Sequence, residues 1–143
     1  MKPEIALGSD HGGFELKEHL KEYLENSDYT IKDFGCHEPK PVDYPDIAKK
    51  VGQYVAKNKV LGILICGAGI GMSMAANKIK GIRAALCYDN YTAKMSREHN
   101  NANILCLGGR TTDKDTAKEI VKTWLSTEFS NEERHIKRIN KIE

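Results

Sequence analysis

Cys66 and the glycine-rich segment after it have the residue types of a catalytic site. Cys66 is followed by Gly67, Gly69 and Gly71, with single residues between them. Glycines at this spacing let the backbone turn sharply and direct its amide N–H groups toward a bound anion. A thiolate beside such amides could act as a nucleophile or as a base. The simpler interpretation is a tight turn next to a small buried thiol, so the pattern leaves the reaction open.

The same segment argues against three common classes of enzyme. The dinucleotide fingerprint needs Gly where this chain has Met72, and the Lys-Ser/Thr pair of a P-loop is missing. A phosphate-transferring cysteine would usually be followed by five loop residues and Arg, and that position is again Met72. Enzymes that use NAD or ATP, and cysteine phosphatases, are therefore disfavoured.

Histidines and arginines elsewhere could complete an anion site. His11 lies in an Asp-His-Gly-Gly segment, which favours a loop at a ligand-binding edge, whereas His99 could simply cap the end of a helix. Arg134 and Arg138 are four residues apart, so both project from one helix face, with Ile136 and Ile139 on the other side. Two such side chains can bind one phosphate, although a solvated basic face is the commoner arrangement.

The elements that must position these residues alternate regularly along the chain. Short apolar runs at 4–7, 30–34, 61–66, 83–87 and 104–107 have strand length, and the segments between them repeat apolar residues with helical period. Strands without polar alternation are covered on both faces. We therefore predict a single Rossmann-like α/β domain over residues 1–143. It has three layers, with a five-stranded parallel sheet, helices on both faces and a C-terminal helix.

This fold predicts where a ligand would bind. In such sheets ligands lie beyond the carboxyl ends of the strands, where the strand order reverses, so the segments after the first, third and fifth strands should meet. We also expect a small-residue helix over 74–79 and a final helix opened by a capping box that starts at Ser130.

Composition and charge exclude several classes of protein. Among 143 residues, Lys and Arg number 22 against 20 Asp and Glu, with both signs interspersed, so neither a nucleic-acid arm nor a membrane anchor is predicted. Apolar runs such as 63–66 are far shorter than the ~20 residues that span a bilayer, and the first residues form no signal peptide. We expect a cytoplasmic protein.

The cysteines show no metal-binding spacing. Cys36, Cys66, Cys87 and Cys106 form no C-x-x-C pair and accompany no paired histidines. In a reducing compartment they should be free thiols, three of them small buried side chains and at most one of them chemically active.

Taken together, these segments resemble the type B ribose-5-phosphate isomerases over nearly the whole chain. The two most specific blocks are Cys66-Gly67-Ala68-Gly69-Ile70-Gly71-Met72-Ser73 and Glu98-His99-Asn100-Asn101-Ala102-Asn103. Further matching segments lie at 8–13, 43–46, 75–78, 108–110 and 134–138. The wider family also includes isomerases of allose 6-phosphate and galactose 6-phosphate.

The resemblance implies an aldose-ketose isomerase, free of metal and cofactor, that interconverts ribose 5-phosphate and ribulose 5-phosphate in the pentose phosphate pathway. Cys66 would move the proton between carbons 1 and 2 through an ene-diolate, and His99 would open the furanose ring. Amides of residues 67–73 would hold the negative oxygen, and Asn100 would support it. The implied substrate-binding residues are Asp10, His11, Tyr44, Gly67, Ala68, Gly69, Gly71, Met72, Ser73, Asn100, Arg110, Arg134 and Arg138.

Within that set, Asp10 and Tyr44 would hold sugar hydroxyls, and His11 and the three arginines would bind the phosphate. The resemblance also implies a homodimer or homotetramer, in which His99 and Asn100 of one subunit face Cys66 of the other. Ala68 departs from the family, which commonly has Thr at this position. The alternatives are an isomerase of allose 6-phosphate or galactose 6-phosphate, the latter as one subunit of a hetero-oligomer, and a sugar-phosphate sensor without catalysis.

Overall fold

Strands and helices alternate along the chain, as its periodicity predicts. The computed structural model describes residues 2–143. Its strands are β1 (Glu4–Ser9), β2 (Thr30–Asp33), β3 (Leu61–Cys66), β4 (Ala84–Leu86) and β5 (Ile104–Gly108). Its helices are a short 3-10 turn, η1 (His11–Gly13), and α1 (Phe14–Asn26), α2 (Tyr44–Asn58), α3 (Ile70–Ala76), α4 (Asn90–Glu98), α5 (Lys114–Ser126) and α6 (Glu133–Ile142). The predicted strands agree with these bounds to within two residues at each end.

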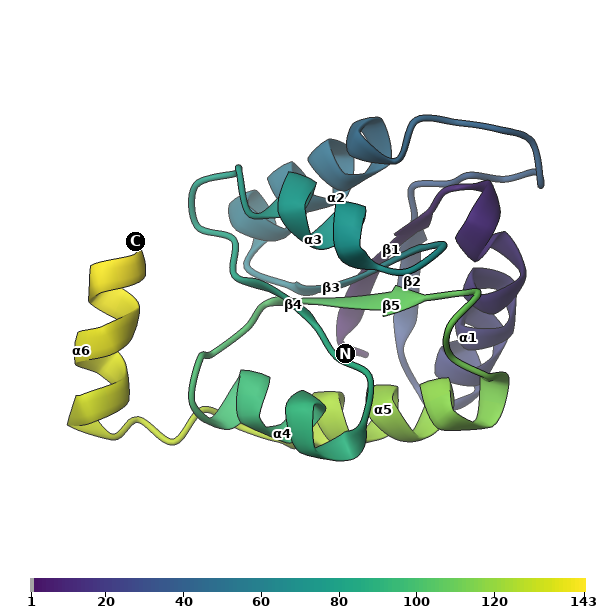
Figure 1. Ribbon diagram of the computed structural model, residues 1–143. Coiled ribbons are helices and arrows are strands. Elements are labelled where there is room, and N and C mark those ends of the chain that lie inside the picture. Colours follow the sequence, from purple (N-terminus) through teal and green to yellow (C-terminus); the bar gives the residue numbers. More distant parts are fainter. Residues whose placement is uncertain (1) are drawn as a thin grey trace.

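The strands form one parallel sheet in the order β2-β1-β3-β5-β4. Helices α2 and α3 cover one face, and α1, α4 and α5 cover the other (Figure 1). The predicted three-layer α/β fold is therefore confirmed. The strand order reverses between β1 and β3, which places a ligand-binding crevice at their carboxyl ends.

Each helical layer packs on the sheet through its own apolar cluster. Leu16, Leu20 and Leu24 of α1 lie four residues apart, so they share one face and join Trp124 of α5 in the first cluster. Val51 and Val55 of α2 and Met72 of α3 form the second cluster, on the opposite face. Because these side chains are almost fully buried, the sheet is a rigid support for the loops at its edges.

Two expected helix boundaries are wrong. The helix predicted over 74–79 begins at Ile70, because Gly69 takes a positive φ of 80° at its N-cap, and it ends at Ala76. Asn77, which follows, bonds through its side chain to both backbone groups of Ala84. The capping box predicted at Ser130 does not form: the N-cap of α6 is Glu132, because Asn131 reverses the chain with a φ of 59°.

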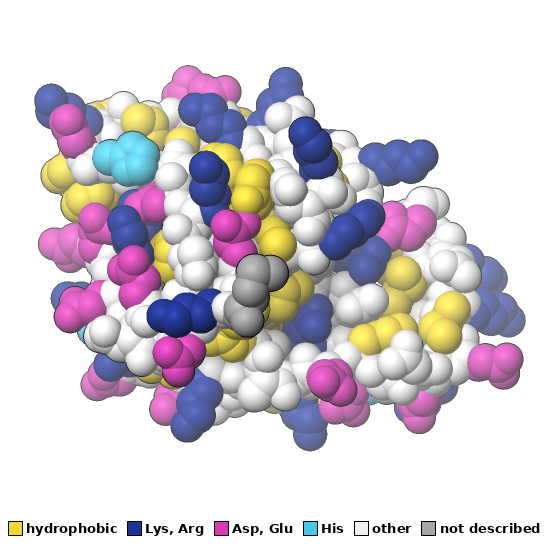
Figure 2. All heavy atoms as spheres, turned by 180° about the vertical axis from the view of Figure 1, so that it is seen from behind, with side chains coloured by type: hydrophobic (Ala, Val, Ile, Leu, Met, Phe, Trp, Pro, Cys, Tyr) yellow, Lys and Arg dark blue, Asp and Glu magenta, His cyan; other side chains and the backbone are white. Residues whose placement is uncertain are grey.

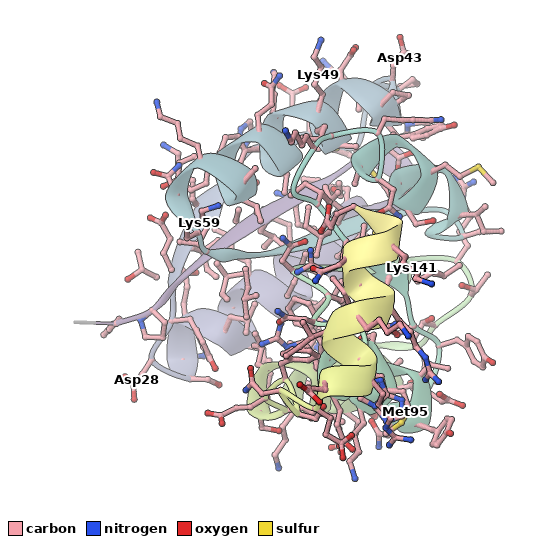
Figure 3. All side chains as sticks on the ribbon, turned by 90° about the vertical axis from the view of Figure 1, so that its left-hand side faces the viewer. Asp28, Asp43, Lys49, Lys59, Met95 and Lys141 are labelled. Carbon is pink, nitrogen blue, oxygen red and sulfur yellow. The ribbon has the colours of Figure 1, made fainter. Side chains whose placement is uncertain are left out.

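Helix α6 extends beyond the layered body at one end of the molecule (Figures 1 and 3). It buries only a narrow stripe, His135 and Ile139, four residues apart. Ile136, which we expected to lie on the same apolar side as Ile139, is 40% exposed. At its far end Glu143 pairs with Arg83, the residue before β4. Helix α6 therefore lies at the amino-terminal edge of the sheet.

The surface mixes charges of both signs. On the face seen in Figure 2, Lys and Arg side chains alternate with Asp and Glu over the whole outline. Among residues 2–143, no helix combines the length and the hydropathy needed to cross a lipid bilayer.

Candidate active site

One group of the predicted site residues meets at the carboxyl ends of β1, β3 and β5, where the strand order predicts a ligand-binding crevice. The amide of Asp10 donates to the carbonyl of Ile65 at 3.2 Å, and the amide of Gly109 donates to the carbonyl of Cys66 at 2.8 Å. A Cβ on Gly12 would lie only 3.1 Å from the amide nitrogen of Gly67. The loops after β1, β3 and β5 are therefore in direct contact, as the fold predicts.

Cys66 is the last residue of β3, where the glycine-rich segment begins. Its side chain is 6% exposed, and Sγ accepts a hydrogen bond from the amide of Gly69 at 3.2 Å. The segment thus curls around the sulfur, and the amides that open α3 come next along the chain. The first amides of a helix have no partner within the helix, so they are free to bind a negative oxygen.

The other cysteines have environments that suit buried thiols. All four are free and buried, as predicted. Burial is the main cause that raises the pKa of Cys106, and it also raises the pKa of Cys87 above its ordinary value. These two side chains are therefore held as neutral thiols, whereas Cys66 faces the glycine-rich turn.

Tyr44 and His11 form one wall of the crevice. A Cβ on Gly71 would lie 2.5 Å from the Tyr44 ring, so glycine is required there for the ring to approach the loop. Tyr44 is 39% exposed and opens α2. The amide of Val42 donates to Nδ1 of His11 at 3.4 Å, which ties the segment before α2 to the loop after β1. Both side chains therefore lie beside the loops that follow β1 and β3.

Asp10 is buried and already has a structural role. Its Oδ1 accepts hydrogen bonds from the amides of Gly12 and Gly13, so it caps the turn η1. A sugar hydroxyl would therefore bind through Oδ2.

Arg110 follows β5 at the rim of the same crevice. Its amide donates to the carbonyl of Gly67 at 2.9 Å, and Nη1 would lie 3.2 Å from a Cβ on Gly67. The guanidinium therefore lies over the start of the glycine-rich segment, where it can bind an anionic group of a ligand.

Met72 and Ser73, both in α3, have side chains that are not free to bind a ligand. The Met72 side chain is fully buried in the core between α3 and the sheet, so only its amide is available to a ligand. The Ser73 hydroxyl donates to the carbonyl of Ile70 at 2.7 Å. The Ser73 amide donates to the carbonyl of Gly69 at 3.2 Å, so the predicted role of backbone amides depends on the residues before it.

The remaining predicted residues lie at the other end of the strands, near their amino ends, which we call the amino-terminal edge of the sheet. Helix α4 begins after β4 at the carboxyl edge and runs back, so its C-cap, His99, and the next residue, Asn100, lie at the amino-terminal edge. Arg134 and Arg138 are on α6, at that same edge and exposed. The five-residue strand β5 separates the two edges, and such a strand spans roughly 17 Å. A single chain therefore does not bring these four residues to Cys66.

Helix α6 meets α4 through a pair of stacked imidazoles. The rings of His99 and His135 have centroids 4.1 Å apart and an interplanar angle of 15°. Burial is the main cause that lowers the pKa of His135, and the neighbouring His99, Arg134 and Arg138 lower it further against the opposing effect of Glu132. His135 is not among the residues that the sequence predicts for the site. Its one signal was its place four residues before Ile139, on the buried stripe of α6.

Within residues 2–143, no group of three or more His, Cys, Asp and Glu side chains has the arrangement of a metal site. The polar groups around Cys66 are backbone amides, an imidazole, a carboxylate, a phenol and a guanidinium. The amides and the guanidinium suit an anionic group such as a phosphate.

Comparison with known proteins identifies the class. The profile of the Ribose/Galactose Isomerase family matches residues 5–142, so the chain belongs to this family of isomerases. The predicted family and the prediction of an isomerase are thereby confirmed.

Several members are similar over nearly their full length. The type B ribose 5-phosphate isomerase of Trypanosoma brucei is 48% identical, with a TM-score of 0.95 over 99% of this chain and 97% of that one. Ribose-5-Phosphate Isomerase B of Clostridium thermocellum is 50% identical, with a TM-score of 0.95 over 97% and 94%. Ribose-5-phosphate isomerase B of Escherichia coli is 41% identical over 140 residues, 97% of this chain and 93% of that protein.

Proposed function

We propose that this protein interconverts ribose 5-phosphate and ribulose 5-phosphate, at sites that two copies of the chain build together. The observation that carries the proposal is the division of the predicted site residues. One set surrounds Cys66 at the carboxyl edge of the sheet, and the other surrounds His99 at the amino-terminal edge. Each set contains groups that the reaction needs and that the other lacks, so two chains complete one another.

Cys66 is the base of the proposed reaction. Its thiolate takes the proton from carbon 2 of the open-chain aldose, and the electrons of that C–H bond form the carbon–carbon double bond of an ene-diolate. The negative charge moves to the oxygen on carbon 1, which then takes the hydroxyl proton from the oxygen on carbon 2. As the sulfur returns its proton to carbon 1, the electrons on the oxygen of carbon 2 form the carbonyl of the ketose. Amides of residues 67–73 stabilise the oxygen as its charge develops. Loss of one such donor typically costs about 2.7 to 4 kcal/mol of transition-state stabilisation.

Groups from both chains hold the phosphate and the sugar. His11 and Arg110 at the crevice face Arg134 and Arg138 of the second chain, and a guanidinium pair can clamp one phosphate. Because the phosphate is remote from the reacting carbons, its binding energy fixes carbon 2 against the sulfur. Oδ2 of Asp10 and the Tyr44 hydroxyl bind sugar hydroxyls.

His99 and Asn100 complete the site from the partner chain. His99 gives a proton to the ring oxygen while the bond between that oxygen and carbon 1 breaks, and the hydroxyl on carbon 1 releases its proton to solvent as the aldehyde forms, which opens the furanose. The Asn100 amide then donates to an oxygen of the ene-diolate. A second copy is needed for both, so the functional unit is at least a homodimer, and a homotetramer satisfies the same requirement.

The surface around the crevice supports such an assembly. Ile70 and Met74 on α3, and Tyr88 and Tyr91 around the start of α4, are 50% to 71% exposed. Exposed large apolar side chains of this kind are available for contact with a second copy of the chain. Four free thiols suit a reducing compartment, so we place the reaction in the cytoplasm, as part of the pentose phosphate pathway.

The test compares catalytic efficiencies on ribose 5-phosphate, allose 6-phosphate and galactose 6-phosphate with protein expressed alone. We expect the highest kcat/KM on ribose 5-phosphate. A preference for a six-carbon sugar would overturn the assignment of ribose 5-phosphate as the substrate, but it would leave the proposed proton transfer unchanged. Binding of all three without turnover would instead identify a sensor, and activity that requires a second, different chain would identify a hetero-oligomer.

A further inference from the structure

His135 is a buried histidine with no place in the reaction proposed above. It is 4% exposed, although its neighbours Arg134 and Ile136 are exposed. Its Nε2 lies 3.2 Å from a Glu132 carboxylate oxygen but makes no hydrogen bond in the described chain. Its one close aromatic contact is the His99 ring, stacked at 4.1 Å. A buried imidazole without a hydrogen bond on Nε2 costs free energy, so the stack needs an explanation beyond stability.

The backbone around His99 is held firmly from other directions. Arg83 donates to the carbonyls of Asn100 and Asn101, and Arg97 donates to the carbonyls of Ala102 and Thr127. Within residues 2–143, the polar and ring contacts of the His99 side chain are Glu98, whose Oε1 lies 3.9 Å from Nε2, and the stacked ring of His135. The nearly parallel stack therefore restrains the plane of the His99 imidazole.

Helix α6 has few other attachments to the body. Ile139 is buried beside His135 on the same stripe, and Glu143 pairs with Arg83 at the far end. A cavity of about 530 Å³ beside this pair is lined in part by Arg83, Asn100 and Ile142, so the end of α6 is not closely packed on the body. The stack is thus a main contact between the helix that carries Arg134 and Arg138 and the helix that ends at His99.

We infer that His135 is a positioning residue: its ring holds the His99 imidazole in the orientation for ring opening and fixes α6, with its two arginines, relative to that imidazole. This inference rests on the proposed function. A neutral ring suits the role, because two stacked imidazolium ions would repel each other, and burial together with the nearby positive groups lowers the pKa of His135.

The test separates ring opening from proton transfer by the choice of sugar. Ribose 5-phosphate is largely a furanose closed through its 4-hydroxyl. Erythrose 4-phosphate has that hydroxyl esterified, so it cannot form the ring and needs no opening. Loss of a correctly oriented His99 should therefore lower kcat on ribose 5-phosphate far more than kcat on erythrose 4-phosphate.

Three variants define the role of the ring. His135→Leu removes the aromatic face, and we expect kcat on ribose 5-phosphate to fall about 10- to 100-fold, with a much smaller change on erythrose 4-phosphate. His135→Phe keeps a stacking ring and should restore most of the selective loss. Lys137→Ala, on the exposed side of the same helix, is the control and should behave as wild type.

Equal losses on both sugars in His135→Leu would overturn the inference, because they indicate general damage to the fold. A His135→Phe variant as impaired as His99→Asn would also overturn it, because His135 would then act on the substrate itself. If His135→Leu does not fold, NMR of the wild type provides the test instead. Magnetisation transfer between the ring protons of His99 and His135 is expected, and its absence would refute the stack. If the wild type isomerises neither sugar, the proposed function is wrong. The stack itself would still be tested by the magnetisation transfer between the two rings.

Discussion

Cys66 is the residue on which the proposed reaction depends. We predict that Cys66→Ala lowers kcat by about 10²- to 10⁴-fold. It should also abolish the exchange of solvent deuterium into carbon 2, because no other side chain is proposed to remove that proton. Binding of the sugar phosphate should persist, since the phosphate contacts are unchanged. Proton NMR measures the exchange, and calorimetry measures the binding.

Cys87→Ala is the matched control for that experiment. Cys87 is also buried and free, but it belongs to the cluster on the other face of the sheet. This variant should isomerise normally even if it is less stable. Full turnover by Cys66→Ala would eliminate the assigned base.

Gly71 tests whether the close approach of Tyr44 to the loop serves substrate binding. A Cβ at this position would lie 2.5 Å from the ring, so Gly71→Ala must displace Tyr44. We expect KM for ribose 5-phosphate to rise about tenfold, which corresponds to about 1.4 kcal/mol, with a smaller change in kcat. Tyr44→Phe gives the comparison. An unchanged KM in both variants would remove Tyr44 from the binding site.

At the scale of elements, a buried ion pair joins α1 to the end of β2. Nζ of Lys17, which is fully buried, donates to Oδ2 of Asp33 at 2.7 Å, while Oδ1 accepts from the amide of Gly35. Breaking a buried pair typically costs about 3–5 kcal/mol, so Lys17→Met should lower the free energy of unfolding by about 3 kcal/mol, since Lys21 still contacts the carboxylate.

Urea unfolding measures this difference. Lys21→Met, which removes the more exposed partner, is the control and should cost less than about 1 kcal/mol. If the two variants were equally stable, burial of Lys17 would have no special role in joining α1 to β2.

The same pair predicts how stability changes in acid. Burial alone would raise the pKa of Asp33, but the hydrogen bonds from Lys17 and Gly35 and the charge of Lys17 outweigh it and lower the pKa. The folded state therefore binds this proton less readily than the unfolded chain. The contribution is present above the unfolded pKa of Asp, about 3.9, and is lost as pH falls through the folded value.

We expect wild type to lose stability below about pH 4 and Asp33→Asn to lack that part of the decline. Urea midpoints measured between about pH 3 and pH 7 compare the two slopes. Parallel slopes would show that Asp33 does not contribute to the pH dependence.

At the scale of the whole molecule, the separation of the two sets of site residues predicts complementation between inactive variants. Cys66→Ala and His99→Asn should each be nearly inactive as homodimers. After unfolding and refolding as an equimolar mixture, half of the dimers are mixed, and each mixed dimer has one intact site, so activity should recover to about a quarter of wild type.

The separate variants, refolded alone, are the control for this mixture, and sedimentation measures the assembly. A mixture no more active than its components would mean that Cys66 and His99 act within one chain, against the topology that places them at opposite edges.

Much of the fold could be predicted from the sequence, because strand and helix periods are local properties of the chain. The apolar stripes of α1 and α2 fixed both helices, and the apolar runs located all five strands to within two residues. The errors lie at the boundaries. Gly69 and Asn131 adopt positive φ values that start α3 earlier and α6 later than expected, and a backbone angle leaves little trace in composition.

The sequence by itself also determined the family, because the residue types and spacings in the blocks at 66–73 and 98–103 are specific. The tertiary structure alone decided which of these residues are neighbours. Cys66 and Arg110 meet because three parallel strands end at one edge, whereas His99 lies at the other edge because α4 runs back along the sheet. Likewise, Lys17 meets Asp33, and His99 meets His135, only through the packing of whole elements. Contacts between residues distant in sequence depend on how helices pack on a sheet, which the local pattern does not specify.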